Sequence, residues 1–111
     1  MSDALAIAAT GLGAAAAAMN ITAQNIANLN TAGYQSQQPV FTAAAGGGVS
    51  VSSTSDTYNG STSRNNVNLA TQMANLGQER LLYDANAAVI VANQQMFGSL
   101  LDIFDNASNR G

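Results

Sequence analysis

Two long stretches of the chain repeat large apolar residues every seven positions. In the first stretch, residues 3 to about 29, the repeated positions are Leu5, Leu12, Met19 and Ile26, and the positions three residues later are Ala8, Ala15, Thr22 and Leu29. This spacing is typical of a helix that packs against another helix along one stripe. The sequence therefore predicts a helix with Ser2 or Asp3 placed to cap its start and Gly33 just beyond its end.

The second stretch runs from residue 67 to about 105. Its seven-residue repeat consists of Leu69, Leu76, Tyr83, Ile90, Phe97 and Phe104, with Met73, Ala87 and Leu101 among the partner positions. Asn66 or Asn68 is suited to cap the start of this helix, and the closing letters "DNASNRG" predict a frayed tail. Gly77 and Gly98 each cost about 1 kcal/mol inside a helix, which suggests that a neighbouring helix passes close to them.

Residues 35 to about 66 have a different composition. They contain the single proline, Pro39, a glycine triplet at 46–48 and many Ser, Thr and Asn residues. Val49–Ser52 alternates as a short strand does, and "YNGS" is a turn signal. The glycine run lacks the lysine and the strand-to-helix context of a phosphate-binding loop. This segment is predicted to be a flexible connector that holds at most a small β-hairpin and supplies no core.

The predicted fold is all-α: a long antiparallel two-helix hairpin or coiled coil. Its one core domain combines an N-terminal axial helix (1–34) and a C-terminal axial helix (67–105), joined by the connector (35–66) and followed by a tail (106–111). At about 1.5 Å per residue the helices are roughly 40 and 57 Å long, whereas a globule of this length has a radius of gyration near 13 Å. We therefore expect a rod that is marginally stable alone and gains stability from copies or relatives packed around it.

Composition excludes several classes of function. The net charge is −3, and the only basic residues are three arginines, too few for a protein that binds a nucleic-acid backbone. The absence of His, Lys and Cys removes the usual general bases, imine-forming amines, and imidazole or thiolate metal ligands. We predict no enzyme, no catalytic or metal-binding residue and no cofactor. Glu79, Arg80 and Asp84 are interpreted as a solvated or inter-subunit salt-bridge cluster.

The uncharged stretch from Ala4 to Ile21 is apolar enough to suggest a signal or membrane segment. However, the sequence begins with an acidic "MSDAL" instead of a positive region, and most of its apolar residues are alanines, which insert poorly into lipid. The prediction is that the chain is not stably inserted in a membrane and has no cleaved signal peptide.

The asparagines of the first helix need an explanation, since each costs roughly 0.5–0.7 kcal/mol there relative to alanine. Asn25 and Asn28 lie within the seven-residue pattern, and their amides are predicted to bond a neighbouring helix or subunit without the desolvation cost of a charge. For Asn30 and Gly33, that role and a simple helix-ending role are equally favoured.

Both ends of the chain carry motifs that together resemble one family. "NITAQNIANLNTAGYQSQQPVF" resembles the N-terminal signature A-x-N-I-A-N-x-N-T-x-G-Y of the bacterial flagellar rod and hook proteins. The matching positions are Gln24, Asn25, Ile26, Ala27, Asn28, Asn30, Thr31, Gly33 and Tyr34. The second half resembles the closing helix of the same family, through Val67-Asn68-Leu69 with Met73, then Tyr83-Asp84-Ala85-Asn86, then Leu100-Leu101-Asp102-Ile103. One departure is Gln72, at a position that is usually acidic in the family.

The resemblance implies a structural subunit of the flagellar basal-body rod. Its terminal helices would pair and polymerise with copies of itself and with other axial proteins into a hollow drive shaft that spans the periplasm, transmits torque and encloses the export channel. The short central segment points to the small proximal-rod type. The family also implies export by the flagellar type III apparatus.

The residues expected to carry packing and assembly are those of the two repeats and of the signature. They are Leu5, Leu12, Met19, Asn25, Ile26, Asn28, Asn30, Gly33, Tyr34, Leu69, Met73, Leu76, Tyr83, Asn86, Ile90, Phe97 and Leu101. The alternative function is a small leaderless secreted helical-hairpin effector, although such proteins commonly carry a Trp-x-Gly turn and this chain has no tryptophan. A membrane-active amphipathic peptide is a more distant alternative, disfavoured by the acidic charge.

Overall fold

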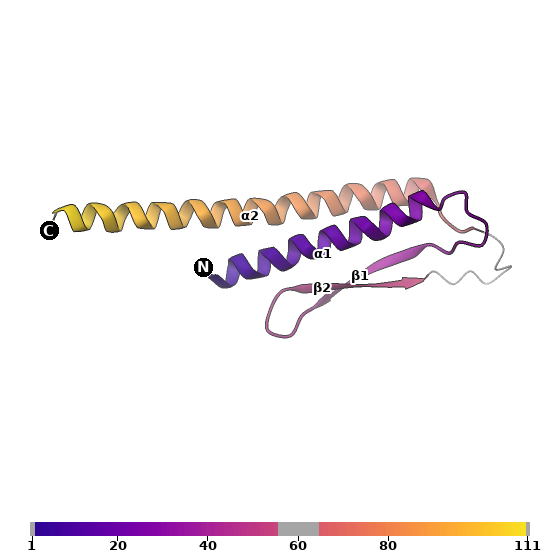
Figure 1. Ribbon diagram of the computed structural model, residues 1–111, viewed down its shortest axis with the longest axis horizontal. Coiled ribbons are helices and arrows are strands. Elements are labelled where there is room, and N and C mark those ends of the chain that lie inside the picture. The colour runs from indigo at the N-terminus through magenta and orange to yellow at the C-terminus, as the bar shows by residue number, and fades with distance from the viewer. Residues whose placement is uncertain (1, 56–64, 111) are drawn as a thin grey trace.

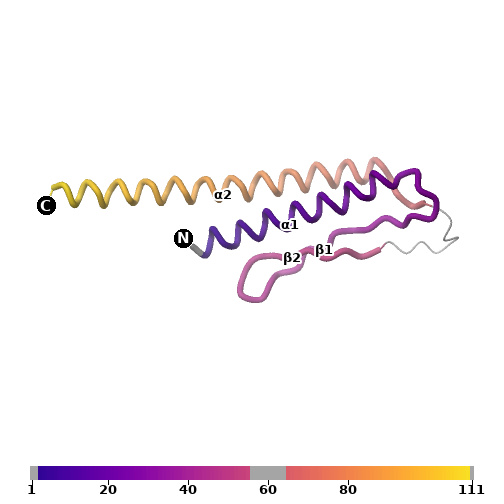
Figure 2. Tube along the Cα trace, viewed as in Figure 1, coloured from indigo at the N-terminus to yellow at the C-terminus, as the bar shows by residue number. Residues whose placement is uncertain are grey.

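The computed structural model describes residues 2–55 and 65–110, which form two antiparallel helices and a β-hairpin (Figure 1). The elements in chain order are α1 (Ser2–Ala27), β1 (Gln37–Ala43), β2 (Val49–Ser55) and α2 (Leu69–Arg110). The molecule measures 77 × 26 × 14 Å, with a radius of gyration of 20.3 Å. α2, α1 and the hairpin lie side by side in one flat layer, as the trace in Figure 2 shows. The predicted pair of long helices is confirmed, and the molecule is a rod.

The side of α1 that is buried consists of small residues. Its buried apolar side chains are Ala8, Ala14, Ala15 and Ala18, and Gly11 is buried with them. The large residues of the predicted repeat are less covered: Leu12, Met19 and Ile26 are half-buried, and Leu5 is 40% exposed. Small side chains allow two helix backbones to approach closely, so α2 packs on the alanine face and the larger residues lie outside it.

α2 begins where the sequence predicts and extends further than expected. The side-chain oxygen of Asn68 accepts a hydrogen bond from the Thr71 backbone N–H at 3.2 Å, which makes Asn68 the N-cap. The prediction of a frayed tail after residue 105 is wrong, because the helix continues to Arg110. No proline or glycine interrupts residues 105–110, and the positive Arg110 lies in the last turn, where the helix dipole favours it.

The expectation for Gly77 and Gly98 is also wrong within this chain. A Cβ atom added at either glycine would meet no atom within 4 Å. The close approach of the two helices occurs instead at Gly11 of α1, where an added Cβ would overlap the side chain of Asn86.

The connector is more ordered than a flexible linker. β1 and β2 pair antiparallel from Gln37↔Ser55 to Ala43↔Val49, which confirms the small hairpin; the "YNGS" turn lies outside the described residues. The loop at its tip has backbone bonds from Ala44 N to Gly48 O (3.0 Å) and from Gly47 N to Ala44 O (3.1 Å). Gly46, Gly47 and Gly48 have φ angles of 88°, 105° and 90°. Because other residues rarely adopt such angles, the three glycines allow the chain to turn at the tip of the hairpin.

The hairpin tip is fastened to α1 by Thr10. The Val49 backbone N–H donates to Thr10 Oγ1 at 3.2 Å, and the same hydroxyl donates to the Ile7 carbonyl at 2.6 Å. Gly48 lies so close that a Cβ there would be 2.5 Å from Thr10 Oγ1. The hairpin therefore packs along α1 as part of the fold, although the buried apolar side chains of the described residues all belong to α1, as the prediction that the connector supplies no core requires.

Candidate functional site

The side of α2 that faces α1 carries polar residues at seven-residue intervals: Gln72, Glu79, Asn86 and Asn93. Gln72 and Glu79 are buried, at 6% and 5% exposed, while Asn86 and Asn93 are half-buried. Residues seven apart lie on one helix face, so these four side chains form a polar stripe. We call this stripe, together with the α1 residues it contacts, the polar seam.

Asn25 of α1 is the centre of the polar seam. Its Nδ2 donates to Gln72 Oε1 of α2 at 2.9 Å and to the Gln37 carbonyl of β1 at 2.7 Å. Its Oδ1 accepts from the Gln37 N–H at 2.9 Å and from the Tyr34 hydroxyl at 2.9 Å. Two donors and two acceptors are the full capacity of an amide, and all of them are used while Asn25 is only 1% exposed. One side chain thus joins α1, α2, the hairpin and the turn between them.

Glu79 lies one heptad further along α2 and meets Thr22. The Thr22 hydroxyl lies 2.5 Å from Oε1 and 2.9 Å from Oε2 of Glu79 and donates its hydrogen bond to this carboxylate, and Thr22 is fully buried. Burial raises the pKa of Glu79 above its ordinary 4.5, and the hydrogen bond from Thr22 lowers it by a smaller amount. The interpretation of Glu79 as part of a solvated or inter-subunit charge cluster with Arg80 and Asp84 is therefore wrong, because Glu79 is turned into the helix pair.

Asn86 occupies the third position of the stripe, directly over Gly11. Its Nδ2 donates to the Leu82 carbonyl one turn back at 2.9 Å, which fixes the amide against the bare backbone of α1. A side chain at Gly11 would occupy the same space. The polar seam therefore combines large polar residues on α2 with very small residues on α1.

A second group of asparagines closes the end of the molecule where α1 and α2 meet. Asn65 Nδ2 donates to the carbonyls of Asn28 (2.6 Å) and Thr31 (2.7 Å), just beyond the end of α1. Asn66 Oδ1 accepts from the Ser36 N–H at 2.6 Å. The carbonyls of Asn28 and Thr31 also accept backbone N–H groups of the turn, from Thr31 and Tyr34. Asn65 therefore adds a second bond to each carbonyl and ties the start of α2 to the end of α1.

The four signature positions Asn25, Asn28, Asn30 and Gly33 differ in what they do. The predicted interhelix bond is confirmed for Asn25 by its contact with Gln72. In this chain Asn28 makes no bond to α2 from its Nδ2, which donates to the Gln24 carbonyl of its own helix at 2.8 Å; a bond from Asn28 to a neighbouring subunit stays a prediction. Asn30 is exposed, in the turn after α1. Gly33 has a φ of 78°, so it serves the turn, as one of its two interpretations required.

The other predicted packing residues lie mostly outside the seam. The half-buried ones are Leu12, Met19, Ile26, Tyr34, Leu76, Asn86 and Ile90. The exposed ones are Leu5, Leu69, Met73, Tyr83, Phe97 and Leu101. Asn25 and Asn86 are the two that the structure brings into the seam between the helices. The large apolar repeats are thus only partly covered by the helix pair, and several of them are exposed.

Sequence reasoning missed Gln72, Glu79 and Thr10. A signal for the first two was present, since Gln72, Glu79, Asn86 and Asn93 keep the same interval of seven as the apolar repeat. Thr10 had no such signal, because its role depends on where the hairpin tip folds back.

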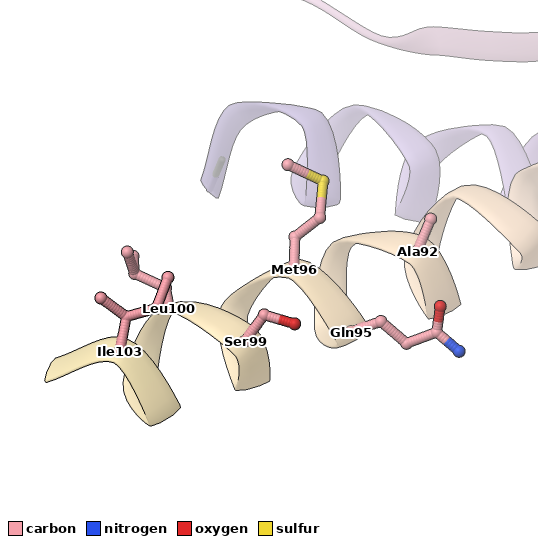
Figure 3. A pocket seen from close by; sticks show the side chains of 6 residues that line it. All are labelled: Ala92, Gln95, Met96, Ser99, Leu100 and Ile103. Carbon is pink, nitrogen blue, oxygen red and sulfur yellow. The ribbon is translucent and has the colours of Figure 1, made fainter. Parts of the chain in front are cut away.

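α2 continues well beyond the N-terminus of α1 (Figure 1). Ala4 lines a pocket with Asn93 and Met96, so the paired part ends near Met96. We call residues 97–110 the overhang. Figure 3 shows Met96 pointing toward the first turns of α1, while Leu100 and Ile103 lie beyond them. The overhang exposes Phe97 (54%), Leu100 (41%), Leu101 (55%), Ile103 (65%) and Phe104 (65%).

The described residues contain no group of three or more Asp, Glu, His or Cys side chains that could hold a metal ion. By length and composition alone, both helices are apolar enough to cross a membrane, over Asp3–Ala27 and within Leu69–Arg110. In the structure, only part of the α1 segment is buried, against α2 and the hairpin, and none of the α2 segment is buried.

Comparison with models of known protein families finds a match over the N-terminal part of the chain. The family model described as "Flagella basal body rod protein" matches residues 5–35. The match covers nearly all of α1 and the turn after it, including Thr22 and Asn25 of the polar seam and Tyr34, which donates to Asn25. No curated protein matches the chain.

Proposed function

We propose that the chain belongs to the flagellar basal body rod protein family, whose model matches residues 5–35, and that it polymerises with copies of itself and with other axial proteins into the hollow rod of the flagellar basal body. Its role in the basal body is structural. The mechanism is mechanical: torque passes through packed helices, no substrate is turned over, and the rod encloses the export channel.

The observation that carries this proposal is that the helix pair leaves much of its apolar surface uncovered. Polar and small residues are buried between α1 and α2, whereas the large apolar residues are only half-buried beside this contact or are exposed. Each Leu, Ile or Phe left in water forgoes about 1.5–3 kcal/mol of burial free energy. A chain built this way gains most of its stability only when neighbours cover its exterior, which is what a subunit of a packed tube requires.

The packing residues belong to the same proposal. Leu5, Leu12, Met19 and Ile26 on α1, and Leu76, Tyr83, Ile90 and Phe97 on α2, would contact neighbouring subunits instead of each other. The apolar surface that makes both helices hydrophobic enough to cross a membrane would then be covered by neighbouring subunits. Export through the flagellar type III apparatus would fit a single small domain that is only marginally stable alone.

The test is an in-frame deletion complemented from a plasmid. We expect the deletion strain to lose swimming and to lack rods in isolated basal bodies examined by electron microscopy. The wild-type gene and Asn20→Ala, a change at an exposed position of α1, should restore both. Asn25→Ala should not.

Unchanged swimming in the deletion strain would eliminate the rod function and favour the secreted effector. Secretion of other flagellar substrates must be measured in the same strain. If the export apparatus itself had failed, no substrate would leave the cell, and the loss of swimming would not report on the rod.

A further inference from the structure

The overhang is an amphipathic continuation of α2 that nothing in the described chain covers. At 3.6 residues per turn, Phe97, Leu100, Leu101 and Phe104 fall on one side of the helix and Asp102 on the opposite side. Leu100 follows Asn93 by seven residues, so it continues the line of the polar seam. The stripe changes from polar to apolar at the point where α1 ends.

The area of this face is large for a monomer. Phe97 and Phe104 are 54% and 65% exposed, and a phenylalanine carries roughly 150–250 Å² of buriable surface. With its aliphatic neighbours the face exposes on the order of 500 Å², at the upper end of the apolar patches on monomeric proteins and over half of what each side of a standard protein interface buries. Such a face is large enough to hold a protein partner.

The same chain carries an open apolar groove at a different position along the long axis of the molecule. The groove lies where α1, the hairpin and α2 meet and has a volume of about 420 Å³. It is lined by the apolar side chains of Ile7, Phe41, Val49 and Leu82, and by Gly11, Gly48 and Asn86. None of these residues is charged, so the groove suits an uncharged apolar insert. The absence of a side chain at Gly11 keeps it open.

One chain cannot fill its own groove with its own overhang. Phe104 and Asn86 belong to one continuous helix, eighteen residues apart, which is about 27 Å at 1.5 Å per residue. A second copy, shifted by about this distance along the rod axis and pointing the same way, would bring Phe104 of one copy over the groove of the other.

We propose that the overhang of one copy docks in the three-element groove of the next copy, with Phe104 as the side chain that enters it. Because the two surfaces differ, the contact is head-to-tail and does not close on itself, and it propagates along an axis. The inference rests on the proposed function for its biological setting and adds to it a specific surface, a partner and a repeat distance. Asp102 stays in water, on the far side of the overhang.

The chain has no cysteine, so single cysteines can report this contact. Val49→Cys places a thiol at the groove wall and Phe104→Cys places one on the overhang. When the two purified full-length variants are mixed and treated with a short bismaleimide, we expect a mixed dimer as the main product. The double variant V49C/F104C should give a ladder of dimer, trimer and longer products on a denaturing gel.

The matched control replaces Phe104→Cys by Asp102→Cys, on the opposite side of the same helix. It should give several-fold less mixed product with Val49→Cys. Phe104→Asp should abolish concentration-dependent association in sedimentation, whereas Ser99→Asp should not. The circular dichroism of Phe104→Asp at low concentration should match that of the wild type, which excludes a folding defect.

Two results would overturn the docking. Cross-linking of Phe104→Cys mainly with itself would mean that two overhangs pair around a two-fold axis. Equal products from the Phe104 and Asp102 variants would mean random encounter. If either result appears while the deletion strain still lacks rods, the docking is wrong and the proposed function stands; normal rods in the deletion strain would refute the function alone.

Discussion

The two parts of α2 show how one helix can serve two partners. From Leu69 to Met96 its α1-facing stripe consists of glutamine, glutamate and asparagine packed on glycine, alanine and threonine. From Phe97 to Arg110 the same side of the helix carries Leu100, flanked by Phe97 and Phe104, and is exposed. Polar contacts within a chain specify which residues face each other, because a slip of register leaves buried donors and acceptors unpaired. Apolar contacts are less directional and are left for the neighbours.

The largest expected effect comes from removing the centre of the polar seam. Asn25→Ala should destabilise the helix pair by about 3 kcal/mol or more, because buried groups of Gln37, Gln72 and Tyr34 lose their partners, at about 1–3 kcal/mol each. Chemical denaturation followed by circular dichroism measures it. Asn20→Ala, exposed on the same helix, should change stability by less than about 1 kcal/mol and in the stabilising direction. Equal losses in both variants would remove Asn25 from its central role.

A smaller effect should follow from filling the point of closest approach. Gly11→Leu would overlap Asn86, and overpacking costs typically about 1–3 kcal/mol. Gly13→Leu is the control: it lies two residues away with no atom near its added Cβ, and gains about 1 kcal/mol of helix propensity. Thermal unfolding should move in opposite directions for the two variants. If both stabilise the protein, α2 does not pack against Gly11.

The buried carboxylate predicts a pH dependence. Because burial raises the pKa of Glu79 above 4.5, the folded state binds a proton more readily than the unfolded state. Stability contributed by this group should fall as pH rises from about 4.5 through the raised pKa, and should level off above it. Thermal unfolding measured across this range should show the slope in the wild type and not in Glu79→Gln.

The variant Thr22→Val tests whether the Thr22 hydroxyl affects this pH dependence. Without the hydrogen bond that lowers the Glu79 pKa, the slope should shift to higher pH. An unchanged profile in Thr22→Val would mean that the hydroxyl does not act on the carboxylate in solution.

The smallest effect separates the two parts of α2 directly. Gly77→Ala in the paired part and Gly98→Ala in the overhang both add a methyl group into open space. Each should stabilise the helix by roughly 0.5–1 kcal/mol. If a neighbouring copy passes close to Gly98, its variant should be folded but impaired in assembly, which sedimentation would show.

The sequence predicted the two helices, their antiparallel pairing and the short hairpin, since these depend on local periodicity and turn residues. The periodicity predicted that the large apolar repeats lie between the helices, because large apolar side chains are usually the most buried ones. In the structure Ala8, Ala15 and Thr22 are buried as predicted, but their companions are Gly11, Ala18 and Asn25 instead of Leu5, Leu12 and Met19. A single helix pair can be joined by small residues, and the sequence of one chain does not say which stripe meets which partner.

The candidate site was harder to predict because its residues are brought together across the fold. Asn25 was identified because an asparagine inside a helix lowers helix stability relative to alanine. Its partners Gln72, Gln37 and Tyr34 lie in three other segments, and only the last belongs to the same motif. The family resemblance predicts an acidic residue at position 72, where this chain has glutamine. The acidic side chain that faces α1 is Glu79, one heptad further along α2. A glutamine accepts the Asn25 amide bond as a carboxylate would, while the buried charge is instead supported by Thr22.

The central claim is that α1 and α2 depend on neighbours to cover their outer apolar faces. The most direct measurement is the helix content and melting temperature of the purified chain over a wide range of concentration, by circular dichroism. We predict less helix than the 26 and 42 residues of α1 and α2 when the chain is dilute, and a melting temperature that rises with concentration. A dilute monomer with full helix content and a sharp transition independent of concentration would contradict the account.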